Sequence, residues 1–228
     1  MDTETVRLIL LGMITLILSI AVHEFGHAIV AYKLGDRLPK VQGRVTLNPL
    51  AHADPIGTLL APLMFLVMSH GTSLGFGWGK PVMVNPLSFT RKLRMRTAHM
   101  LVAAAGPAMN LILATVLVAV HATLLHFRVL DVSSDFNRFL QYGVGLNVAL
   151  MFFNLIPAPP LDGGTVIEGL LPDRWIPGFQ RYAVYGPFVL MAVIFIPQLR
   201  WIIITPTAWL TQHLYLGAFH IMGMPHAS

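Results

Sequence analysis

An apolar stretch from about residue 8 to residue 32 carries a short polar motif, and this combination limits what the chain can fold into. The stretch is long enough to cross a bilayer as a helix. Within it lie His23, Glu24 and His27, and ionisable groups at membrane depth are costly enough to indicate function. On a helix the two histidines share one face about one turn apart, so both imidazoles can hold one metal ion. Glu24 is offset around the helix and can reach a metal-bound water without being a ligand.

The same pattern has a structural interpretation. Histidines in membrane helices also form hydrogen bonds between helices, and an HExxH pattern arises by chance in some chains. A third ligand elsewhere in the chain would favour metal binding.

Composition indicates an integral membrane protein. Of the 228 residues, 55% are hydrophobic and only 11% are charged, whereas soluble domains carry about 25% charged residues. Cysteine is absent, so disulfides and thiolate ligands are excluded, and a zinc site of nitrogen and oxygen alone favours a catalytic over a closed structural site. The net charge of +5 comes from basic residues in loops beside apolar segments. We therefore expect a lipid bilayer as partner and no nucleic acid.

We expect an α-helical polytopic membrane protein formed by a single membrane-embedded domain, residues 1–228. Its core, residues 8–165, would hold three catalytic helices, and the C-terminal helices, residues 183–220, would add about two spans. The five expected spans are residues 8–32, 98–125, 139–156, 183–199 and 201–220. The amino terminus begins with Asp2 and Glu4 rather than a basic region, so we expect it to be retained rather than cleaved as a signal peptide.

The region between the first two spans, residues 36–90, predicts a re-entrant segment and short strands. Residues 56–69 are apolar but short for a span and are interrupted by Pro62, which is typical of a re-entrant segment. Residues 41–47 partly alternate and predict a strand. Residues 71–86 are glycine-rich at their start and predict a hairpin or strand at the membrane surface. There residues 82–84 could capture a substrate by strand addition, and the glycines could form a gate.

Basic residues indicate the orientation. Nine of the fifteen Lys and Arg residues fall within residues 33–97. They are Lys33, Arg37, Lys40, Arg44, Lys80, Arg91, Lys92, Arg94 and Arg96. Under the positive-inside rule this side is cytoplasmic, so we expect a multi-pass protein of the cell membrane whose active site opens toward the cytoplasm. For the motifs of the three core spans to meet at one depth, residues 56–69 must return to the side they left.

Asp162 is the natural third ligand. It follows the proline cluster at residues 157–160, which ends the third span, and precedes Gly163 and Gly164, which permit a tight turn. Irregular backbone at membrane depth survives only where protein buries it or where it lines a watery cavity. A metal-bound water requires such a cavity. Taken alone, Asp162 could be an ordinary helix cap, but with His23 and His27 it completes a ligand set.

Together these motifs resemble the site-2 protease family of intramembrane zinc metalloproteases, in its small form lacking a PDZ domain. Residues 23–27 (HEFGH) resemble the HExxH helix of the family, and residues 154–164 (NLIPAPPLDGG) resemble its NxxPxPxxDG segment. Residues 106–110 (GPAMN) resemble its central GxxxN motif. The resemblance covers roughly residues 8–165 and does not extend to the last part of the chain.

The resemblance implies a role for each matching residue. The zinc ligands would be His23, His27 and Asp162. Glu24 would act as general base and then as general acid, Asn154 would help hold substrate or oxyanion, and Asn110 would lie near the active site. The reaction would be hydrolysis of a peptide bond within or near a transmembrane helix of a membrane-protein substrate, as in regulated intramembrane proteolysis. From the residues alone, either asparagine could instead form an ordinary hydrogen bond between helices.

Other interpretations stay open. A non-catalytic zinc-binding membrane protein, such as a transporter or membrane chaperone, could use the same ligands, although it would not need Glu24, and a transporter would more often show two related halves. His52 and Asp54 form another potential ligand pair, for which the neighbouring prolines favour a plain turn. The alternative is that His52 approaches the zinc or the substrate path in a closed state. The remaining histidines lack ligand spacing and are expected to be structural: His70, His99, His121, His126, His213, His220 and His226. The oligomeric state stays open.

Overall fold

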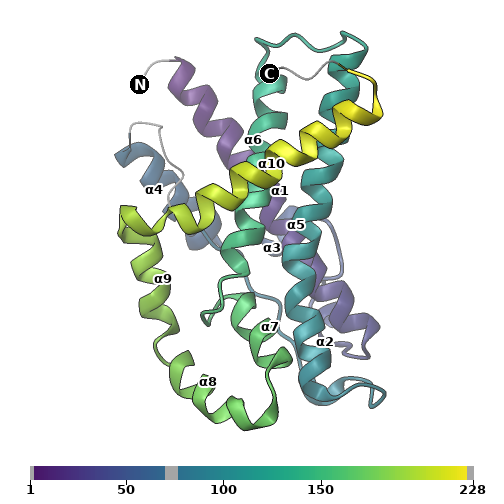
Figure 1. Cartoon of the computed structure of the whole chain (residues 1–228), viewed down its shortest axis with the longest axis vertical. Helices are drawn as coiled ribbons and strands as arrows, with labels where there is room; N and C mark the ends of the chain where they lie inside the picture. The colour runs from purple at the N-terminus through teal and green to yellow at the C-terminus, as the bar shows by residue number, and fades with distance from the viewer. Residues whose placement is uncertain (1–2, 70–76, 225–228) are drawn as a thin grey trace.

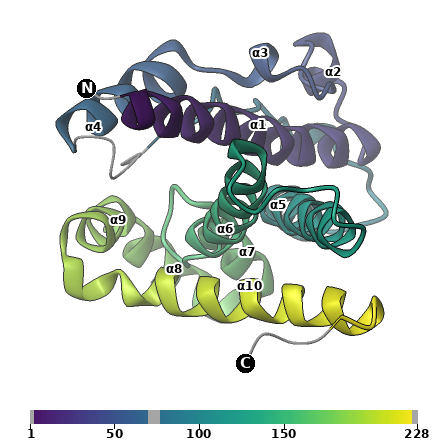
Figure 2. The same cartoon turned by 90° about the horizontal axis from the view of Figure 1, so that it is seen from above.

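Three long helices form the centre of the molecule. The computed structural model describes residues 3–69 and 77–224. The central helices are α1 (Thr3–Lys33), α5 (Met95–His126) and α6 (Asp135–Asn154). In Figure 1, α5 and α6 run along the long axis and α1 crosses behind them. Figure 2 shows the layers: α1 with α2, α3 and α4 on its outer side, α5, α6 and α7 in the middle with α9 to one side, and α10 along the far side.

Helix α5 connects these layers because it packs against α1, α6 and α7. Small residues permit the close approach: Ala98, Ala114 and Ala122 on α5 are fully buried. Gly26 on α1 lies so close to α5 that a Cβ there would come within 2.5 Å of the Ala105 carbonyl oxygen. The two helices are therefore in close contact at the level of the HExxH motif.

The sequence around α6 explains where that helix begins and ends. Ser134 caps its start by accepting a hydrogen bond from the Asn137 amide at 3.2 Å, and Asp135 places a negative charge in the first turn. The prolines of residues 157–160 prevent the helix from continuing. The chain then turns back and begins α7 (Asp162–Leu170), which packs against α5 and has Asp162 as its first residue.

Fewer helices than expected have the length and apolar composition of a membrane span. Within the described ranges, α1 and α5 qualify, and a third span results if the bent pair Asp173–Ala183 and Gly186–Phe195 is counted as one, with a bend of 57°. The fourth expected span, residues 183–199, is thus a short helix, α9 (Gly186–Phe195), preceded by α8 (Ile176–Ala183). The third and fifth correspond to α6 and α10 (Trp201–Ile221), which are long enough but too polar to qualify.

The segment between α3 and α5 leaves the helix bundle and comes back. After α2 (Leu38–Val41) and α3 (Pro49–His52), a π-helical turn (Pro55–Leu60) continues into α4 (Ala61–Met68). The Trp78 amide then donates to the Gly57 carbonyl at 3.0 Å, and the Lys80 amide donates to the His52 carbonyl at 2.9 Å. The two ends of the excursion therefore lie side by side, as the re-entrant prediction requires.

The predicted strands are wrong for the described part of the chain, which contains only helices, turns and extended segments. Residues 41–47 form the end of α2 and a turn, in which Gly43 adopts a φ of +68° and the Arg44 amide donates to the Pro39 carbonyl. Residues 70–76 of the expected hairpin lie outside the described ranges. Residues 77–85 are extended, but helix α1 and nearby loops take up their amides: Val82 donates to Glu24 and Asn85 donates to Asp36. No partner strand is needed.

Candidate metal centre

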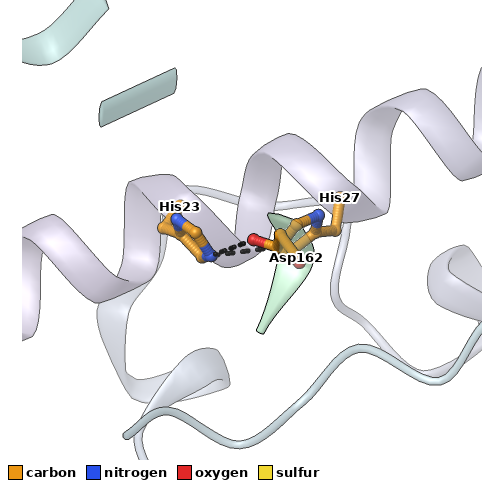
Figure 3. Close-up of side chains that lie close together, drawn as sticks. All are labelled: His23, His27 and Asp162. Carbon is orange, nitrogen blue, oxygen red and sulfur yellow. Dashed lines mark hydrogen bonds and ion pairs between the residues drawn. The ribbon is translucent and has the colours of Figure 1, made fainter. Parts of the chain in front are cut away.

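His23 and His27 face one another on α1 as helical spacing requires. Their Nε2 atoms are 3.1 Å apart and their ring centroids 4.7 Å apart. His23 is buried, at 8% exposure, where α1 packs against α5. Figure 3 shows both rings projecting from the same side of the helix.

Asp162 brings a carboxylate to these two nitrogens from the start of α7 (Figure 3). Its Oδ2 lies 3.2 Å from His23 Nε2 and 3.3 Å from His27 Nε2, and no hydrogen-bond donor reaches that oxygen from the described residues. The glycines after it are needed for close approach: a Cβ at Gly163 would overlap the Leu155 and Ile156 carbonyls, and one at Gly164 would come within 2.7 Å of the Pro159 ring. The turn that delivers Asp162 therefore depends on residues without side chains.

The other ring nitrogen of each histidine is held by the protein. His27 Nδ1 lies 2.8 Å from the Val102 carbonyl oxygen, which can only accept, so Nδ1 carries the proton. His23 Nδ1 lies 2.6 Å from the side-chain oxygen of Asn110. With Nδ1 protonated, the Nε2 lone pair of each ring is free to bind a metal, which is how metal-binding histidines are usually oriented. Asn110 thus touches a candidate ligand directly.

Gly106, the first residue of the GxxxN motif, makes room for the two rings. A Cβ at this position would overlap atoms of both His23 and His27. Asn110 lies one turn further along the same face of α5. The motif therefore combines a space for the imidazoles with a hydrogen-bond acceptor for one of them.

The donor set fits zinc. A zinc ion bound tetrahedrally at about 2.0–2.1 Å has ligand atoms about 3.3 Å apart. The three separations here are 3.1, 3.2 and 3.3 Å. Within residues 3–69 and 77–224, this group is the one set of three or more His, Asp and Glu side chains with this geometry. Two nitrogens and one oxygen leave a fourth position open, as in catalytic zinc sites.

Glu24 is not part of the ligand group. Its Oε2 accepts a hydrogen bond from the Val82 amide at 3.2 Å, so the extended segment of residues 77–85 passes beside it. This amide was expected to be free for strand addition to a substrate, and it is instead bonded to the expected general base.

Asn154 is also outside the ligand group. It is the last residue of α6, and its Nδ2 donates back to the Leu150 carbonyl of the same helix at 2.9 Å. Its role in holding substrate or oxyanion stays a prediction. Asn147, which sequence reasoning missed, is bonded to Asn110 at 2.8 Å. The sequence signal that could have pointed to Asn147 is its position two helical turns before Asn154 on the same helix.

The second candidate pair, His52 and Asp54, forms a turn. Asp54 caps the π-helical turn by accepting hydrogen bonds from the Ile56 and Gly57 amides, as the favoured interpretation predicted. His52 is fully buried, its Nε2 lies 2.8 Å from the Thr46 carbonyl oxygen, and it is not a member of the metal group. The proposed approach of His52 to the zinc therefore has no support in this arrangement. His70 and His226 lie outside the described residues.

Comparison with known proteins identifies the class. Residues 11–197 match the model of peptidase family M50, which is the site-2 protease family, and the chain belongs to that family. Zinc is accordingly its metal.

Among individual proteins, the chain is 40% identical over 198 residues to "Putative zinc metalloprotease YwhC" of Bacillus subtilis (strain 168), covering 85% of this chain and 84% of that protein. Rip2 of Mycobacterium tuberculosis (strain H37Rv), which bears the same description, is 35% identical over 157 residues, covering 67% of this chain and 54% of Rip2. Rip2 of Mycolicibacterium smegmatis is 28% identical over 186 residues, covering 81% and 67%. No solved structure matches the chain.

Proposed function

We propose that the chain is an intramembrane metalloprotease that hydrolyses a peptide bond within or near a transmembrane helix of a membrane-protein substrate. His23, His27 and Asp162 hold the zinc in this proposal. The observation that carries it is the convergence of their three ligand atoms, with separations of 3.1–3.3 Å, beside a carboxylate that is not itself a ligand. Zinc bound there would supply a Lewis acid and a water whose pKa is lowered toward neutrality.

The protein side chains divide the remaining work. Glu24 accepts a proton at its carboxylate and returns it to the leaving amine nitrogen, as a general base and then a general acid. Asn110 and the Val102 carbonyl keep the two imidazoles in the tautomer that leaves Nε2 free. Asn154, at the end of α6 near the turn that delivers Asp162, is assigned to substrate or oxyanion binding because of its place in the motif. The Val82 amide bonds to Oε2 of Glu24, and the carboxylate keeps its other oxygen to accept the proton.

We further propose that the site opens toward the cytoplasmic side of the cell membrane. The loops that adjoin the lower ends of α1 and α5 carry most of the basic residues of the region between them. Positive charge on short loops marks the cytoplasmic side. Substrates would then be membrane proteins whose scissile segment is delivered at this level, as in regulated intramembrane proteolysis.

The test is cleavage of a panel of single-span substrates in detergent by the wild type, Glu24→Gln and Glu168→Gln. Glu168 lies on α7 and accepts a hydrogen bond from Gln180 near the surface, so it is a matched control for the loss of a carboxylate. We expect Glu24→Gln to lower the cleavage rate by roughly 10²–10⁴-fold, with zinc content unchanged, and Glu168→Gln to cleave as the wild type does. If all three proteins bind zinc and Glu24→Gln cleaves as fast as the wild type, the role of Glu24 is refuted. Zinc bound without cleavage of any substrate would favour a non-catalytic zinc protein.

A further inference from the structure

A chain of buried amides runs from α6 to His23. Asn147 on α6 is 1% exposed and Asn110 on α5 is fully buried. Asn110 Nδ2 lies 2.8 Å from Asn147 Oδ1, and Asn147 Nδ2 lies 2.9 Å from Ser19 Oγ and 2.8 Å from the Gly143 carbonyl oxygen. Asn110 Nδ2 also lies 3.2 Å from the Ser19 carbonyl oxygen. The network joins three helices in a region where water is scarce.

The backbone carbonyls fix the direction of every bond in this network. A carbonyl oxygen only accepts, so the group that Asn147 turns to the Gly143 carbonyl must be its NH₂. The oxygen of Asn147 then faces Asn110, which must present its own NH₂, and this leaves the oxygen of Asn110 facing His23. His23 Nδ1 must therefore donate. Each amide, which alone could be flipped, has a single orientation that satisfies all its neighbours.

The orientation matters for the metal centre. If Asn110 were flipped, its NH₂ would face His23 Nδ1, which would have to accept, and the ring proton would move to Nε2. A protonated Nε2 cannot bind a metal. His27 needs no such network because a backbone carbonyl, that of Val102, holds its Nδ1 directly.

We propose that Asn147 is a positioning residue that, through a shorter hydrogen bond than that of the Ser19 carbonyl, helps to fix the orientation of Asn110 and, through it, the tautomer of His23 that binds the metal. Asn147 contacts Asn110, which in turn contacts the candidate ligand His23. This inference rests on the proposed metal-binding role of His23. It differs from a packing role because it requires an acceptor facing Asn110 rather than a side chain of a given volume.

Two substitutions separate the roles. Asn147→Leu conserves the approximate volume but offers no acceptor to Asn110. Asn147→Asp keeps an oxygen facing Asn110 and is the harsher change for folding, since it buries a carboxyl group. A packing role predicts that Leu is tolerated better in every measurement. The positioning role predicts the reverse order for metal affinity, with Asp close to the wild type and Leu weaker.

The matched control is Asn137, on the same helix. It is 4% exposed and also bonds to a buried histidine, His121, but that histidine is not in the metal group. Asn137→Leu should lower thermal stability in detergent without changing the zinc dissociation constant.

The experiment measures the zinc dissociation constant of the purified proteins by competition with a chromophoric chelator, together with the visible spectrum of the Co²⁺-substituted forms and thermal unfolding. We expect Asn147→Leu to weaken zinc binding on the order of tenfold, the lower end of the range for residues that orient ligands, and to alter the Co²⁺ spectrum. Asn147→Asp should remain within about threefold of the wild type, well below that range.

Equal zinc binding by the wild type and Asn147→Leu would overturn the inference and leave the proposed function intact. If the Leu variant does not fold, a more than tenfold loss in Asn147→Asp would overturn it as well. A wild type that binds neither zinc nor Co²⁺ would refute the metal centre, and the inference would fall with it.

Discussion

Two groups of side chains around buried histidines have opposite characters, one formed by α1 and α7 at the metal centre and the other by α5, α6 and α10. At the metal centre, His23 and His27 bond to the protein through Nδ1 only, and their Nε2 atoms converge on an Asp162 oxygen that lacks a hydrogen-bond donor. Toward the other end of α5, His121 is 2% exposed, and both its nitrogens are bonded to the protein: Nδ1 lies 2.7 Å from the Tyr215 hydroxyl and Nε2 lies 2.8 Å from Asn137 Oδ1.

The difference shows how a structural histidine can be told from a ligand without a metal in view. His121 is fully satisfied by Tyr215 on α10 and Asn137 on α6, so it fastens these helices together. Each metal-centre histidine is held by a hydrogen bond at Nδ1, and the Nε2 atoms of the two rings point toward one another. Burial and polarity are alike in the two clusters. The deciding property is the convergence of unused lone pairs.

The largest effect should come from removing a converging ligand. Asp162→Ala should reduce zinc affinity by more than about 100-fold, which exceeds the effect expected for residues that only orient ligands. His121→Leu should leave zinc affinity unchanged. It should lower the unfolding temperature, because Tyr215 and Asn137 lose their hydrogen bonds to the histidine. Zinc content after dialysis and a thermal scan in detergent measure both. Stoichiometric zinc in Asp162→Ala would break the comparison.

A smaller effect should follow from crowding the two rings. Gly106→Ala places a methyl group against both His23 and His27, so we expect zinc affinity to fall by about tenfold or more, comparable to the loss of an orienting partner. Gly145→Ala on α6 is the control, since a Cβ there meets no atom within 4 Å. It should keep zinc affinity and stabilise the helix by up to about 1 kcal/mol. If the two substitutions behave alike in a zinc titration, the tight fit at Gly106 has no role in metal binding.

The sequence predicted the two long apolar helices well but not the surface segments. Helices α1 and α5 are specified by long uninterrupted apolar composition, a property of the chain itself. The strand at residues 41–47 was predicted from alternation and the hairpin or strand at residues 71–86 from its glycine content. Either pattern produces a strand only if a partner strand is present. Here the Val82 amide bonds to Glu24, and that contact depends on how residues 77–85 pack on α1. At the C-terminal end, the fourth expected span is the short helix α9, bent by 57° from the preceding helical segment, and α10 is too polar to qualify as a span.

The candidate ligands and Asn110 could be singled out from the sequence, whereas Asn147 could not. The i, i+4 spacing of His23 and His27 and the chemistry of an aspartate in a proline–glycine turn are local patterns, and the structure brings the three side chains together. Asn147 has no local pattern that links it to His23. Its contact with Asn110 exists because α5 and α6 pack with these positions facing, and packing of this kind is not encoded in spacing along one helix.

The smallest expected effect tests the structural cluster. Asn137 Nδ2 donates to the Val132 carbonyl, so Asn137 Oδ1 accepts from His121 Nε2, and His121 Nδ1 accepts from the Tyr215 hydroxyl. Tyr215→Phe removes that donor and should lower the free energy of unfolding by about 1 kcal/mol, without changing zinc affinity, because the cluster shares no side chain with the metal centre. Tyr142→Phe, at a residue 44% exposed on α6, should change neither quantity. Unfolding in a denaturing detergent measures the stability of both variants, and a zinc titration measures their zinc affinity. Weaker zinc binding in Tyr215→Phe would show that the two clusters are coupled through α5 and α6 rather than independent.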